Sequence, residues 1–174
     1  MKRLSILTIL LVISFSGFSQ DVKYGVRGGL NISNLDFDGD SPKLNKHRNS
    51  IYFGAFATIG LSKTISVMPE LQFSAEGAKD ETLNLDYIQI PILLRFRMSE
   101  KIHFGLGPQV GLKVRKVDDN AKDFAYSAVA GLEYKLNHVL FADVRYTYGL
   151  ANVFTSSLLE AKNTNIQIGV GYKF

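Results

Sequence analysis

The residues of this 174-residue chain that are best suited to binding or catalysis are charged side chains within apolar stretches. Three are carboxylates and four are guanidinium groups. They are Arg27, Glu70, Arg95, Arg97, Glu133, Asp143 and Arg145. Carboxylates and guanidinium groups form strong charge-assisted hydrogen bonds, and buried charges cost several kcal/mol unless they are paired. We predict that these residues form a network of ion pairs that fills an interior, with a gated ion path as the functional alternative.

A second candidate is a stretch of acidic and amide residues, Asn34-Leu-Asp-Phe-Asp-Gly-Asp40. Asn34, Asp36, Asp38 and Gly39 match positions 1, 3, 5 and 6 of a calcium loop, and Asp40 adds a further carboxylate. Position 12 is Asn45 where a bidentate Glu is expected. Asp-Gly is also an ordinary turn signal, so the alternative interpretation is a polar loop that binds no ion.

Signals for other chemistry are poor. The chain has no cysteine, and its histidines His47, His103 and His138 lack metal-ligand spacing. No nucleophile elbow or phosphate-binding loop occurs. Acidic residues near one rim, Asp86, Asp118 and Asp119, have no neighbouring histidine. We therefore expect no catalytic residue, no cofactor and no enzyme activity, and keep a rim enzyme acting on lipids or peptides as an alternative.

Apolar and polar residues alternate along most of the chain, which is the period of a β-strand. The alternation predicts an all-β fold of eight antiparallel strands, near 23–32, 50–60, 64–77, 84–97, 101–115, 124–136, 139–149 and 163–174. The connectors are alternately short and long. Short turns at one end and long polar loops at the other are typical of an up-and-down transmembrane β-barrel of the outer-membrane type.

The charged strand residues all share one parity within their strands, except Asp86 at a strand end. The same parity is rich in glycine, which suits the narrow interior of an eight-stranded barrel. The opposite parity is apolar. It carries two aromatic belts, one of Phe53, Phe73, Phe124, Tyr126, Tyr146 and Tyr148, the other of Phe96, Phe104, Tyr134, Phe141, Tyr172 and Phe174. These belts favour a lipid-facing wall. An exported soluble barrel that holds an apolar ligand, like a lipocalin, is the inverse interpretation.

The last strand alternates almost perfectly and ends on an aromatic residue. Its length fits the roughly 9–11 residues of a tilted strand that crosses a bilayer. Tyr172 and Phe174 are therefore the candidates for closing the barrel.

Residues 1–20 have the pattern of a secretory signal peptide, with Lys2 and Arg3 before a short apolar run and small residues after it. Its removal leaves 18 basic residues against 16 acidic residues, a net charge of +2 that gives no argument for nucleic acid. We expect residues 21–174 to form a single domain.

Five segments have distinctive motifs: Gly25–Ser33, Leu85–Leu94 with its Tyr-x-x-Ile-Pro pattern, Gly105–Gly111, Val144–Leu150 and Gly169–Phe174. Through them the chain resembles the PorT-like outer-membrane β-barrel family of Bacteroidetes. The resemblance implies a cell outer membrane location, insertion by the barrel-assembly machinery guided by Tyr172 and Phe174, and a link to protein secretion. We expect a monomeric structural or interaction protein whose partners are outer-membrane lipid and envelope or secretion-system proteins.

Overall fold

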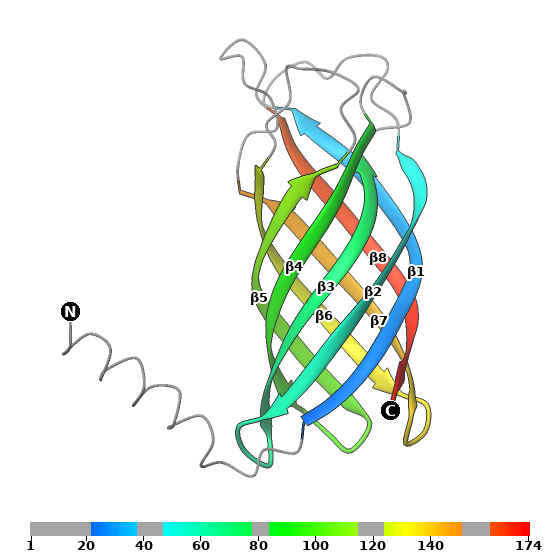
Figure 1. Ribbon diagram of the computed structural model, residues 1–174, viewed down its shortest axis with the longest axis vertical. Helices are drawn as coiled ribbons and strands as arrows, with labels where there is room; N and C mark the ends of the chain where they lie inside the picture. Colours follow the sequence, from blue (N-terminus) through cyan, green and yellow to red (C-terminus); the bar gives the residue numbers. More distant parts are fainter. Residues whose placement is uncertain (1–21, 38–46, 78–83, 115–123, 151–160) are drawn as a thin grey trace, which may run out of the picture.

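A computed structural model describes residues 22–37, 47–77, 84–114, 124–150 and 161–174. Eight strands form one closed antiparallel barrel in which each strand pairs with its sequence neighbours and β8 pairs with β1 (Figure 1). The strands are β1 (Val22–Phe37), β2 (Arg48–Gly60), β3 (Ile65–Gly77), β4 (Asn84–Arg97), β5 (Ile102–Lys113), β6 (Phe124–Lys135), β7 (Leu140–Gly149) and β8 (Ala161–Lys173). The predicted fold class is therefore confirmed.

The strands start and end within a few residues of the predicted bounds, except at the end of β1. β1 was expected to end at residue 32, but it continues to Phe37 because its pairing with β8 extends to Ala161. The three short turns and the C-terminus lie at one end of the barrel (Figure 1). Among the described residues, no helix has the length and apolar character needed to cross a membrane.

The outer wall of the barrel is apolar, as the alternation predicts. Residues at the middle of the strands, such as Leu30, Ile90, Val144 and Ile168, are 48% or more exposed. The belt residues with the largest exposed fractions are Phe53, Phe124, Tyr126, Tyr134, Tyr146, Tyr172 and Phe174. Placing Phe141 in a belt was wrong, because this side chain is 1% exposed inside the barrel. Phe141 shares the inward parity of Asp143 and Arg145, and strand parity decides its side whatever its hydrophobicity.

Glycines give the interior the space that its largest side chains need. A Cβ atom on Gly171 would lie 2.0 Å from Cζ of Phe141, and one on Gly169 would lie 2.0 Å from the Tyr52 hydroxyl. Phe141 packs edge-on against Phe56, with 5.7 Å between ring centroids. These two rings form a small apolar cluster with Met68, Leu93 and Val129. Gly169 and Gly171 therefore leave the space that Tyr52 and Phe141 occupy inside the barrel.

Three prolines interrupt three neighbouring strand ladders. Pro69, Pro91 and Pro108 each fall in a two-residue gap, in β2–β3, β3–β4 and β4–β5 respectively, and the register is the same on both sides of each gap. Proline has no N–H group to donate to a ladder, so a gap is expected at each position. The register is nevertheless retained, which keeps Glu70 and Arg95 on the inner face.

Candidate functional site

The centre of the lumen holds a closed ring of four charged side chains. Arg27 on β1 bonds Glu70 on β3 at 2.9 Å and Asp143 on β7 at 2.6 Å. Arg145, also on β7, bonds the other Glu70 oxygen at 2.8 Å and Asp143 at 3.0 Å. All four residues are at most 4% exposed. Two cations and two anions balance, so the ring is neutral and each charge has two opposite partners.

Arg27 is the member of the ring with the most partners. Its Nη1 also donates to the side-chain carbonyl oxygens of Gln72 and Gln167, each at 3.1 Å. Its Nη2 donates to the Tyr52 hydroxyl at 2.8 Å, and its guanidinium carbon lies 4.3 Å from the centre of the Tyr52 ring. These contacts come from β2, β3, β7 and β8, and β3 and β7 lie opposite each other in the barrel. The ring therefore ties opposite walls of the barrel together.

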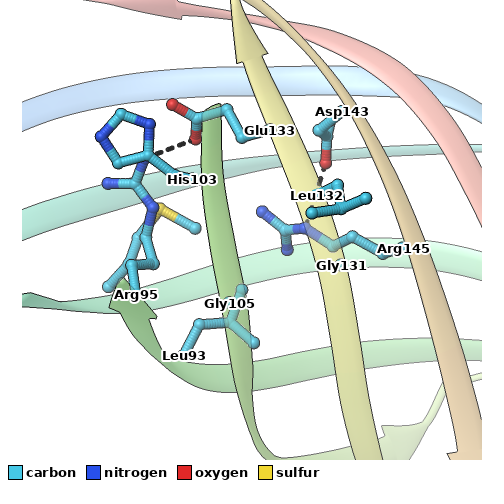
Figure 2. A pocket seen from close by; sticks show the side chains of 10 residues that line it. Leu93, Arg95, His103, Gly105, Gly131, Leu132, Glu133, Asp143 and Arg145 are labelled. Carbon is cyan, nitrogen blue, oxygen red and sulfur yellow. Dashed lines mark ion pairs between the residues drawn. The ribbon is translucent and has the colours of Figure 1, made fainter. Parts of the chain in front are cut away.

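A second ion-pair group lies nearer the short-turn end. Glu133 on β6 pairs with Arg95 on β4 at 2.7 Å and with Lys173 on β8 at 2.5 Å. Figure 2 shows the Arg95–Glu133 pair beside the Asp143–Arg145 pair. The cavity between the two groups measures about 20 Å³. A water molecule needs roughly 10–15 Å³, so this space holds about one water.

The long-loop half of the lumen contains a buried carboxylate with a different environment. Glu76 on β3 is 1% exposed. Its Oε1 accepts hydrogen bonds from the Ser74 hydroxyl at 2.7 Å, from Gln89 at 2.9 Å and from Asn165 at 3.0 Å, and its Oε2 accepts one from Asn163. All four donors are neutral. The carboxylate is thus held by hydrogen bonds from neutral groups, unlike Glu70 and Glu133.

Replacing Glu76 by glutamine is expected to leave the free energy of unfolding unchanged or to raise it by about 1 kcal/mol. The amide keeps the acceptor used by Ser74, Gln89 and Asn165, and rotation of the Asn163 amide restores its bond. The substitution also removes a buried charge that neutral groups compensate poorly. The matched Glu76→Met variant leaves donors unpaired and should lose about 1–3 kcal/mol. Urea unfolding in micelles measures both, and equal losses would contradict this account.

The sequence of the chain matches the family profile described as outer membrane protein beta-barrel domain over residues 5–174. The chain belongs to this family of outer-membrane β-barrels. The family places the protein in the outer membrane, in contact with membrane lipid, and the short-turn end is its periplasmic end. A search of the curated proteins gives no match.

Solved structures support the same fold for this family member. The attachment invasion locus protein Ail of Yersinia pestis has a TM-score of 0.59 and 15% identity, covering 87% of this chain and 98% of Ail. Neisserial surface protein A has a TM-score of 0.56 and 14% identity, covering 87% of this chain and 97% of that protein. At these identities the likeness concerns the fold alone.

Six of the seven residues predicted to form the lumen network lie in the two ion-pair groups. Arg97 departs from the prediction. It is the last residue of β4, it is exposed, and within the described part of the chain it forms no ion pair. Sequence reasoning missed Glu76, although it lies on the same strand and the same face as Glu70. Counting strand parity past Glu70 would have found it.

The calcium candidate departs from the predicted loop. Asn34 and Asp36 lie in β1, paired with Thr164 and Lys162 of β8, so an extended strand occupies the positions that would have to wrap around the ion. Asp38 and Asp40 lie outside the described residues. No group of three or more His, Asp or Glu residues in the described ranges could hold a metal ion.

The remaining candidates lie at the two ends of the barrel. Phe174 donates its backbone N–H to the carbonyl of Tyr24 at 2.9 Å, and its ring packs edge-on against Tyr172 with 5.5 Å between centroids. At the opposite end, Asp86 bonds Arg48 at 3.0 Å. Asp118 and Asp119 lie outside the described residues. The terminal aromatics thus lie at the β8–β1 seam, while their roles in closing the barrel and as an assembly signal stay predictions.

Proposed function

We propose that this outer-membrane protein is a non-conducting barrel that acts as a structural and interaction component of the envelope. The observation that carries the proposal is the ring of Arg27, Glu70, Asp143 and Arg145. An ion path would need mobile water where these side chains bond one another across the lumen. Paired charges that bond one another across the lumen instead fill the interior and hold the wall in one shape.

Planar-bilayer recording tests the closed lumen. The purified protein should insert without stepwise current, because the ring and the layer of Arg95, Glu133 and Lys173 block the path in series. Co-flotation with liposomes confirms insertion, and a porin in the same bilayer is the positive control. Reproducible stepwise conductance of the inserted wild type would contradict the proposal.

The working surfaces of a closed barrel are its two ends and its lipid-facing wall. Export by a signal peptide over residues 1–20 and the absence of a catalytic role complete this proposal. Membership of the PorT-like proteins of Bacteroidetes, and with it a role in secretion, is supported by sequence motifs such as Tyr87-Ile-Gln-Ile-Pro91. Co-purification from the native membrane tests that role, and recovery of secretion components is the expected result.

The two alternative functions have less support. A lipocalin-like barrel needs an apolar interior of roughly 300–1,000 Å³, whereas this lumen is crossed by buried charged and amide side chains. A rim enzyme needs a nucleophile or base with a partner. The described rim carboxylate, Asp86, instead forms an ion pair with Arg48.

A further inference from the structure

The periplasmic end of the lumen opens into a basic cavity of about 320 Å³. We call this cavity the periplasmic vestibule. Its lining comes from β1, β2, β3, β4, β5, β6 and β8 and from two of the short turns, so it occupies the mouth of the barrel rather than the lipid-facing wall. Its volume is many times the roughly 10–15 Å³ that one water molecule requires. It can therefore accept a small molecule.

The lining of the vestibule is strongly positive. Among the described residues, it contains six lysine and arginine side chains and no aspartate or glutamate. The six are Lys23, Lys63, Arg95, Arg97, Lys135 and Lys173. Glu133 lies deeper and pairs with Arg95 and Lys173. Within the described part of the chain, Lys63, Arg97 and Lys135 form no ion pair. A mouth lined with one sign of charge and walled by a low-dielectric barrel concentrates anions.

Polar atoms with no partner lie in the wall of the vestibule. Oγ1 of Thr58 and Nδ1 of His103 are buried and have no hydrogen-bond partner among the residues that the structure describes. Both residues line the vestibule. Buried polar groups are satisfied in the great majority of cases, by protein, by water or by a ligand. The vestibule therefore has two unsatisfied polar atoms in its wall, and a bound molecule rich in oxygen would offer acceptors to the unpaired cations around them.

We propose that the periplasmic vestibule binds a soluble anion that carries phosphate groups. Phosphate is an acceptor-rich group with up to two charges, which matches a lining of cations and hydroxyls, and lysine is an established point-charge partner of phosphate. A single carboxylate would neutralise only one of the unpaired cations. The ligand is soluble because the barrel wall separates the vestibule from the lipid headgroups around it.

Isothermal titration of the full-length protein in neutral detergent with pyrophosphate tests the proposal. The variant Arg97→Gln/Lys135→Gln should bind pyrophosphate at least about tenfold more weakly than wild type, because each charged hydrogen bond contributes about that factor. The matched control is Lys101→Gln/Lys162→Gln. It removes the same charge from a periplasmic turn and from β8, outside the vestibule lining, and should keep wild-type affinity. Far-UV circular dichroism and heat-modifiable gel mobility show that both variants are folded.

Four results would overturn the proposal. The first is no measurable binding of pyrophosphate by folded wild type. The second is equal weakening in both double variants, which would indicate a general effect of net charge. The third is binding of citrate or oligoglutamate as tight as that of pyrophosphate, which would exclude a preference for phosphate. The fourth concerns the affinity for pyrophosphate in nanodiscs that contain phosphatidic acid. If wild type and the Arg97→Gln/Lys135→Gln variant no longer differ in this affinity there, the site would be assigned to a lipid headgroup.

Discussion

Replacing Arg27 by methionine is expected to lower the free energy of unfolding by about 3–5 kcal/mol, the cost of breaking a buried ion pair by removing one partner. The loss leaves Glu70 and Asp143 with a single cation, Arg145, between them. It also removes the donor to Tyr52, Gln72 and Gln167. Methionine keeps most of the aliphatic length, so the effect reports charge and hydrogen bonding more than volume.

Urea unfolding in detergent micelles, followed by far-UV circular dichroism, measures the effect of the Arg27 substitution, because the chain has no tryptophan. The double variant Arg27→Met/Asp143→Asn leaves a neutral Glu70–Arg145 pair and should lose less than the sum of the two single variants. The control is Arg97→Met, the same substitution at an exposed position, with an expected change within about 0.5 kcal/mol. The ring would be contradicted if Arg27→Met were as stable as Arg97→Met. It would also be contradicted if the losses of unfolding free energy at Arg27 and Asp143 were strictly additive in the double variant.

Introducing arginine at Val144 should lower the stability of the barrel in lipid vesicles by about 2–4 kcal/mol, the cost of this side chain on the lipid face at the bilayer midplane. Val144 is in the middle of β7 and is 49% exposed on the outer wall. The introduced guanidinium would have to leave water or distort the bilayer around it. No lumen contact changes, so the loss reports the surroundings of the wall.

The matched control for Val144→Arg is the same substitution at Val114, which is 45% exposed and directly follows the end of β5 at the long-loop rim. Arginine near the interface costs only about 0–1 kcal/mol. Folded fractions across a urea series in phosphatidylcholine vesicles, read from gel mobility without boiling, give both values. Equal and negligible losses at the two positions would mean that water covers the wall.

The strands and their faces could be predicted because both are local properties. Successive side chains on a strand point to opposite sides, so alternation separated two faces, and the aromatic belts and the glycines favoured lipid for the apolar face. The error at Phe141 came from letting hydrophobicity override that alternation, and Gly171 provides the space for the ring inside. The extension of β1 to Phe37 depends on its pairing with β8, which lies at the other end of the chain.

The sequence by itself therefore determined the barrel, the lipid-facing wall and the set of charged side chains that face inward. Only the tertiary structure decided which charges pair, because partners such as Arg27 and Glu70 lie on strands that are not neighbours and meet only across the closed lumen. Closure also left Glu76 among neutral donors and Arg97 at the periplasmic mouth. Strand parity fixes the side of each residue, whereas the stagger of the closed barrel fixes its height and its partner across the lumen.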